Sequence, residues 1–200
     1  MRQSIFCCAA LALSMAASST YAAWRVDSTQ STFSFVTAKA GAPGTGGIEE
    51  VQAFKQIGGT LGDDGKLQFA VDLASVETHI PLRNDRLKNL LFRVADYPQA
   101  VFTGSVDTHR FDALPVGASA DVELGGQLTI VGQTRPLTAN LRVVKLEADS
   151  LLVGTRMPIV VNLKDYGLQD GVEALRNVMN LDVLASSAPV SFSVVLRSAK

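Results

Sequence analysis

Residues that could carry out chemistry are few and widely spaced in this chain. There are only two histidines, His79 and His109, and neither has a second histidine three to five residues away. That spacing is typical of zinc sites, so the sequence predicts no metal ligand. No Gly-x-Ser-x-Gly segment is present, and the carboxylates form no obvious acid–base pair. We therefore expect no catalytic residue and no enzyme activity, although a triad can also be assembled from residues far apart in sequence.

Two other segments have the composition of a functional site but lack its remaining parts. The segment 41–47 reads G-A-P-G-T-G-G, but no Lys-Ser or Lys-Thr follows as in a phosphate-binding loop. Asp63 and Asp64 lack the other ligand positions of a calcium-binding loop. We interpret the first segment as a flexible loop and the second as a hairpin turn.

The charged residues that call for an explanation lie in one short helix. A strand pattern precedes it, and the apolar spacing then changes to i, i+3, i+4 and i+7 at Leu87, Leu90, Leu91 and Val94. On a helical wheel Arg83 falls within about 40° of Leu87, on the apolar face. Two interpretations stay open for this arginine. It either bonds strand-end carbonyls or Glu77 and so holds the helix, or, together with Arg86, it binds the polar head of a ligand.

The elements around this helix read as strands. About eight or nine alternating segments joined by short turns, without β-α-β alternation, indicate an all-β antiparallel barrel or sandwich. The single helix would then close one barrel end. An eight-stranded barrel is either filled by side chains or holds one small ligand, and the pattern leaves both open. The side chains expected inside are Phe33, Phe35, Phe69, Val71, Phe102, Leu128 and Ile130.

The N-terminus has the three parts of a secretory signal peptide. Arg2 precedes the apolar run 5–17, and Thr20 and Ala22 occupy the −3 and −1 positions of a cleavage site. We expect a signal peptide at residues 1–22 and one domain at 23–200, without cysteine, because both cysteines lie in the leader. No later stretch has the ~20 apolar residues of a transmembrane helix. With 18 basic and 19 acidic residues, the chain has no excess positive charge for binding nucleic acid.

Five segments, in order along the chain, resemble those of the YceI-like family of secreted bacterial proteins. They are W-R-V-D with Q-S-T-F-S-F, A-S-V-E-T-H-I-P-L-R-N-D-R-L, L-F-R-V-A-D-Y-P-Q-A-V-F, G-G-Q-L-T-I-V-G-Q-T-R-P-L and V-N-L-K-D-Y-G-L. The chain also departs from the family pattern. Arg86 stands where the family usually has histidine, and the first loop has Lys39 near the position of another histidine.

The resemblance implies a lipocalin-like antiparallel β-barrel of about eight strands, with one short helix at a barrel end, in the periplasm. It also implies an internal tunnel that holds a polyisoprenoid lipid, with a quinone or a polyprenyl phosphate as candidate ligands and no other cofactor. We expect a carrier, store or scavenger of such a lipid. Two rival hypotheses are an enzyme acting on an isoprenoid lipid and an interaction module with a solid core.

Overall fold

The computed structural model describes residues 22–42 and 46–199. The predicted signal peptide, residues 1–22, lies outside the described residues except for Ala22, and so does the middle of the predicted loop 41–47. The longest strand, β1 (Ala22–Ala40), contains the predicted strand 31–36 and continues at both of its ends. No helix in the described residues is long and apolar enough to cross a bilayer.

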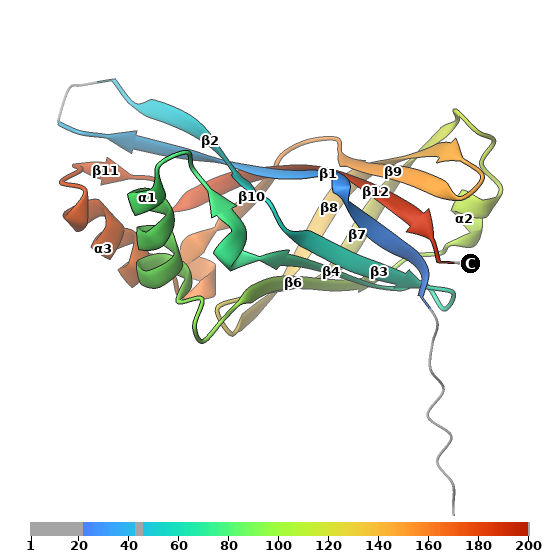
Figure 1. Cartoon of the computed structure of the whole chain (residues 1–200), viewed down its shortest axis with the longest axis horizontal. Helices are drawn as coiled ribbons and strands as arrows, with labels where there is room; N and C mark the ends of the chain where they lie inside the picture. Colours follow the sequence, from blue (N-terminus) through green and yellow to red (C-terminus); the bar gives the residue numbers. More distant parts are fainter. Residues whose placement is uncertain (1–21, 43–45, 200) are drawn as a thin grey trace, which may run out of the picture.

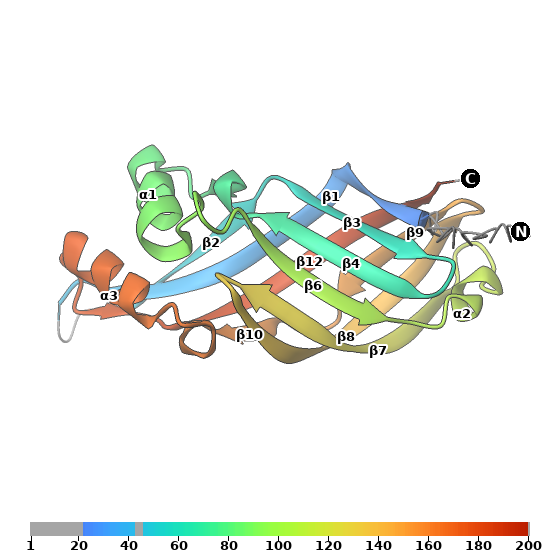
Figure 2. The same cartoon turned by 90° about the horizontal axis from the view of Figure 1, so that it is seen from below.

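Eight strands pair in an unbroken antiparallel ring, which confirms the predicted barrel. Strand β1 pairs with the last strand on one side and with the next ring strand on the other, so the sheet closes on itself. Figure 2 shows the strands running obliquely around the barrel. The other ring strands, in chain order, are β3 (Ile57–Gly62), β4 (Lys66–Asp72), β6 (Gln99–Ser105), β7 (Ser119–Ile130), β8 (Gln133–Glu147), β9 (Ser150–Thr155) and β12 (Ser187–Ser198).

Four further strands lengthen the wall at one end only. The second half of β1 leaves β3 and pairs with β2 (Ile48–Phe54), from Ser34 to Lys39. Figure 1 shows this β1–β2 ribbon reaching beyond the ring. The remaining short strands are β5 (Val76–Glu77) beside β2, β10 (Ile159–Asn162) beside β12, and β11 (Val183–Leu184) beside β1.

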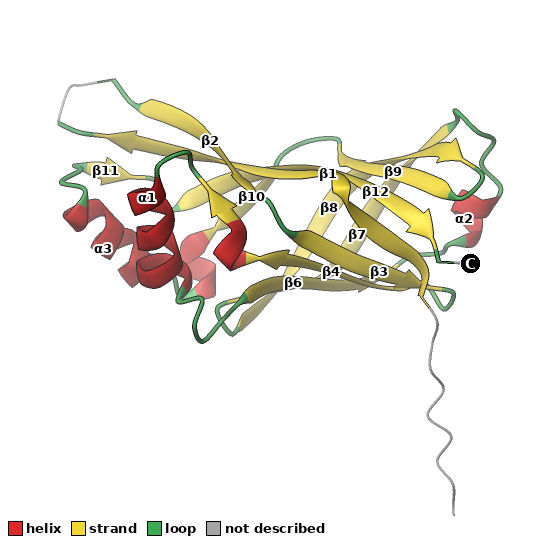
Figure 3. Ribbon diagram, viewed as in Figure 1, coloured by secondary structure: helices red, strands yellow, loops and turns green. Residues whose placement is uncertain are grey.

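Helices lie at both ends of the barrel. The helix predicted from the leucine spacing is present as α1 (Pro81–Arg86) and the π-helical turn η2 (Leu87–Phe92). The longer α3 (Gln169–Val178) packs against η2 at the same end, whereas α2 (His109–Asp112) lies at the other end (Figure 3). The contact between α3 and η2 requires Gly171, since a Cβ there would lie 2.8 Å from the Leu90 carbonyl oxygen. Two 3₁₀ turns complete the described part of the chain, η1 (Leu73–Ser75) and η3 (Leu163–Tyr166).

The helix differs from the prediction in which side chains it buries. Leu87 and Leu91 are buried as expected, but Leu90 is 39% exposed and Phe92 is buried instead. The reason is that η2 is a π-helix, whose wider turn shifts the buried face by about one residue. Val94 lies beyond the helix, because Arg93 takes a left-handed backbone conformation, with φ of 50°, and ends it.

The strands β2 and β3 are separated by a short break. It lies at residues 55–56, while Ile57 to Leu61 pair with β4 in an uninterrupted register. Gly59 is required for close packing of the strands, since a Cβ at this position would lie 2.6 Å from the carbonyl oxygen of Gln68.

Candidate functional site

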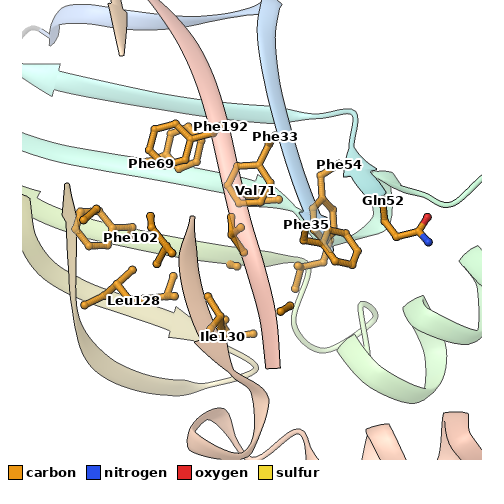
Figure 4. Close-up of a pocket in the computed structure, with 18 of the residues that line it drawn as sticks. Phe33, Phe35, Gln52, Phe54, Phe69, Val71, Phe102, Leu128, Ile130 and Phe192 are labelled. Carbon is orange, nitrogen blue, oxygen red and sulfur yellow. The ribbon is translucent and has the colours of Figure 1, made fainter. Parts of the chain in front are cut away.

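The barrel encloses an elongated cavity of about 290 Å³, to which all eight ring strands contribute side chains. Successive residues of a strand point to opposite faces of the sheet, so alternate apolar residues face the inside. The structure places all seven of the predicted interior residues on the cavity wall, and Figure 4 labels them. They are Phe33, Phe35, Phe69, Val71, Phe102, Leu128 and Ile130. Their contact with a ligand stays a prediction.

Several of these inward-facing side chains are only partly buried, although they point away from the outer surface. Phe33, Phe69 and Leu128 pack against the core cluster yet retain accessible surface. A side chain inside a filled barrel would lose this surface to its neighbours. The accessible surface of these three residues therefore faces the cavity.

Phenylalanines form a connected group along the cavity wall. The ring of Phe33 stacks on Phe69 and on Phe192, with centroid distances of 6.1 and 6.2 Å, and meets Phe54 edge-on at 5.9 Å. Phe54 in turn contacts Phe92 of η2 at 5.8 Å. Phe192 was not among the predicted lining residues, but it lies on the cavity wall. Its alternation with Val190, Val194 and Leu196 in β12 was the signal that could have found it.

The cavity wall becomes polar at the end near α1. On β1 the inward positions change from Phe33 and Phe35 to Thr37 and Lys39, and on β2 they change from Phe54 to Gln52 and Glu50. Thr78 and Arg83 join these residues from the α1 side. We call Lys39, Glu50, Gln52, Thr78 and Arg83 the polar cluster. Lys39, Glu50 and Gln52 belong to the same inward-facing rows that carry the phenylalanines.

Glu50 is the centre of the polar cluster. Its Oε2 lies 2.7 Å from Lys39 Nζ and 2.6 Å from Arg83 Nη1. The hydrogen bond from Lys39, reinforced by the positive charge of Arg83, lowers the pKa of the Glu50 carboxyl below its usual value. Glu50 is therefore ionised at neutral pH and carries one negative charge between two positive ones.

Arg83 is largely buried, with 14% of its side chain exposed, and has two fixed partners. Nη1 donates to Glu50, and Nη2 donates to the Thr78 carbonyl oxygen at 2.7 Å. Its carboxylate partner is Glu50 rather than Glu77, which the sequence had suggested. Glu77 instead accepts hydrogen bonds from Lys55, Asn84 and the His79 backbone, which lower its pKa to about 2.

The second arginine considered for a ligand head group lies elsewhere. Arg86 is not among the cavity-lining residues, whereas Arg83 is. Of these two arginines, the structure therefore places Arg83 alone at the polar end of the cavity. Their side chains are about 60° apart around the helix axis, because they are three positions apart in α1.

Two buried polar atoms in the polar cluster have no hydrogen-bond partner. They are Oε1 of Gln52 and Nε of Arg83, and no other such side-chain atom occurs among the described residues. Gln52 is 3% exposed, and its amide points towards the helical end in Figure 4. Buried polar atoms are almost always paired, so each exception requires an explanation. Gln52 was not predicted as a site residue, because a glutamine in an alternating strand carries no signal of burial.

The histidines are separate from the cavity. Neither His79 nor His109 lines it, and His109 is almost fully exposed beside Asp112, at 4.0 Å. Within residues 22–42 and 46–199, no three histidine, cysteine or acidic side chains form a group that could hold a metal ion.

Solved structures of three proteins are similar to this chain over most of its length. A solved polyisoprenoid binding domain from Saccharophagus degradans, implicated in plant cell wall breakdown, is 30% identical, with a TM-score of 0.84 over 89% of this chain and 99% of that chain. BcnA of Burkholderia cenocepacia is 20% identical, with a TM-score of 0.63 over 85% of this chain and 98% of that chain. The YCEI protein of Campylobacter jejuni is 17% identical, with a TM-score of 0.50 over 74% and 85%.

The two more distant structures show the fold alone. A comparison with curated proteins gives no match. The model of the YceI-like domain matches residues 24–196, which is nearly all of the described chain. The chain therefore belongs to the YceI-like domain family.

Proposed function

We propose that this protein binds a long apolar lipid of the polyisoprenoid class in its barrel cavity. The observation that carries the proposal is the cavity itself, which extends from Phe111 of α2 to Arg83 of α1 and is lined mainly by aliphatic and aromatic side chains. An elongated apolar space fits an elongated apolar molecule. The similar domain from Saccharophagus degradans, a polyisoprenoid binding domain, supports the same ligand class.

The energetics of such binding depend on shape and apolarity. Removing apolar surface from water gains roughly 25 cal/mol per Å², so a tail of several hundred Å² gains several kcal/mol on entering the cavity. No catalytic group is needed for this gain. The phenylalanine group offers flat apolar surfaces to an isoprenoid chain along the cavity.

The cavity favours this hypothesis over its two rivals. An interaction module with a solid core would fill the barrel, whereas here side chains such as Phe33 and Leu128 keep accessible surface inside it. An enzyme acting on the lipid would need a reacting group beside it. The titratable side chains on the cavity wall are Lys39, Glu50 and Arg83, and they bind one another.

We further propose that the protein acts in the periplasm as a carrier, store or scavenger of the lipid. The support is the N-terminal segment, in which a positive charge, an apolar run and small residues precede Ala23. Cell fractionation with N-terminal sequencing tests this proposal. Recovery of the protein in the periplasmic fraction with an N-terminus near Ala23 is expected, and a protein that still begins at Met1 would overturn it.

A cavity-filling variant tests the binding proposal. Ala139 lies on the cavity wall in β8, so Ala139→Phe puts a ring into the tunnel. The neighbouring Thr138 is exposed and points outwards, so Thr138→Phe is the matched control. Native mass spectrometry of the purified proteins should show bound lipid with the control variant, and less or shorter lipid with Ala139→Phe. Equal lipid content and length in the two variants would contradict binding in the cavity.

A further inference from the structure

Gln52 and Arg83 together leave one acceptor and one donor unused at the polar end of the cavity. The unpartnered atom of Gln52 is a carbonyl oxygen, which accepts, and that of Arg83 is an Nε–H, which donates. Leaving each of these buried groups unpaired costs free energy in the empty protein. A ligand group that both donates and accepts would satisfy them at once.

The two atoms lie in the same part of the cavity. Glu50 and Gln52 are two residues apart on one face of β2, which separates them by about 7 Å along the strand. Glu50 contacts Arg83 at 2.6 Å, so the guanidinium lies beside the row of inward side chains that includes Gln52. Both residues line the same cavity. Both unpartnered atoms therefore belong to residues at the same polar end of the cavity.

The acceptor atom of Gln52 disfavours a fully ionised head. Its Oε1 can only accept a hydrogen bond, and a phosphate dianion carries no proton to donate to it. The Glu50 carboxylate, 2.7 Å from Lys39 and 2.6 Å from Arg83, neutralises one of their two positive charges and repels an anion. An uncharged group that carries a proton therefore fits Gln52 better than a phosphate does.

We infer that Gln52 and Arg83 form a subsite for an uncharged hydroxyl group at the end of the prenyl lipid. The hydroxyl oxygen accepts from Arg83 Nε–H, and the hydroxyl proton is donated to Gln52 Oε1. This inference rests on the proposed function, and it specifies the head group as an alcohol or a quinol rather than a phosphate. Gln52 is the specificity residue, because Arg83 also stabilises the empty protein through Glu50 and Thr78.

Three probes with the same tail test the subsite in delipidated protein: geranylgeraniol, its methyl ether and geranylgeranyl phosphate. The methyl ether accepts a hydrogen bond but cannot donate one, so it measures the contact with Gln52. One lost hydrogen bond in a buried site corresponds to roughly tenfold in affinity. The wild-type protein should bind the alcohol about tenfold more tightly than the ether, and more tightly than the phosphate.

The variant Gln52→Met keeps the length of the side chain and removes the amide. It should abolish the preference for alcohol over ether, while the affinity for the ether stays within about twofold of wild type. The matched control is Gln127→Met, at an exposed position outside the cavity wall, which should keep the preference. Wild-type protein that binds the ether or the phosphate as well as the alcohol would overturn the inference and leave the proposed function standing. Failure to bind any of the three would overturn both.

Discussion

The two ends of the barrel are built on the same strands but are closed by different chemistry. At the α2 end, Phe111 is 4% exposed and packs with Trp24 and Leu151 in an apolar cluster. At the α1 end, the inward faces of β1 and β2 become polar, and Glu50 bridges Lys39 and Arg83. One end is therefore held by packing, whereas the other adds a network of hydrogen bonds and charges to the packing of Leu87, Leu91 and Phe92.

Because of this difference, the two ends of the cavity favour different parts of a ligand. An apolar chain end needs no hydrogen-bond partner beside the apolar cluster at α2, whereas a polar group there would have few partners. At α1 a polar group finds Gln52 and Arg83, whose buried atoms are unpaired. A lipid with one polar end is therefore expected to bind in one orientation only, with its tail towards Phe111.

The largest effect on stability is expected at the apolar end. Phe111→Ala removes a buried ring from α2, and Phe→Ala changes in protein cores cost about 3–5 kcal/mol. Urea unfolding, followed by circular dichroism, measures the change in the free energy of unfolding. Val116→Ala is the control at the same end, because Val116 is 64% exposed, and its effect should stay below about 0.5 kcal/mol. Similar losses in both variants would show that packing does not close this end.

A smaller effect is expected when the charge network at the other end is broken. Arg83 has only 14% of its side chain exposed, and Glu50→Ala removes its carboxylate partner. Breaking a buried pair costs 3–5 kcal/mol and an exposed pair at most about 1 kcal/mol, so we expect about 2 kcal/mol for this partly buried pair. Urea unfolding measures it. The exposed neighbour Glu49→Ala should change stability by less than about 0.5 kcal/mol, and an equal loss there would contradict the bridging role of Glu50.

Lowering the pH should remove the contribution of Glu50 to the free energy of unfolding. Its pKa is lowered in the folded protein, so its stabilising effect is fully present above the ordinary value of 4.5 and is lost as the pH falls through the folded value. We expect the difference in the free energy of unfolding between wild type and Glu50→Gln to be constant above pH 4.5 and to shrink below it. Because both proteins share all other titrating groups, the difference isolates Glu50. A difference that grows in acid would contradict the assignment.

The apolar lining of the cavity could be predicted from the sequence, whereas most of the polar cluster could not. Residues such as Phe69 and Val71 alternate with polar neighbours, and alternation alone determines which side of a sheet a residue faces. The position of Arg83 on the inner side of α1 also followed from helical geometry. Both depend on contacts between residues close in sequence.

The remaining features depend on contacts between residues far apart in sequence, which form only when the barrel closes. Arg83 meets Glu50 across 33 residues, and no local pattern distinguishes Glu50 from the nearby Glu77. Gln52 is buried because β2 continues the wall beyond the ring beneath the helical end. The π-helical turn packs against α3, far away in the sequence, and it buries Phe92 in place of Leu90.

The smallest effect concerns Lys145, a cation on the inward face of β8 near the α2 end. Lys145 continues the row of Ala139, Leu141 and Val143, is 6% exposed, and forms no ion pair within the described part of the chain. Its Nζ lies 5.3 Å from the centre of the Trp24 ring, a cation–π contact worth about 0.5–2 kcal/mol. Lys145→Met keeps the apolar stem and removes both the contact and the cost of burying the charge, so these terms offset each other. We expect urea unfolding to show a change below about 1 kcal/mol. A loss as large as that of Glu50→Ala would mean that charge, and not packing alone, also closes the apolar end.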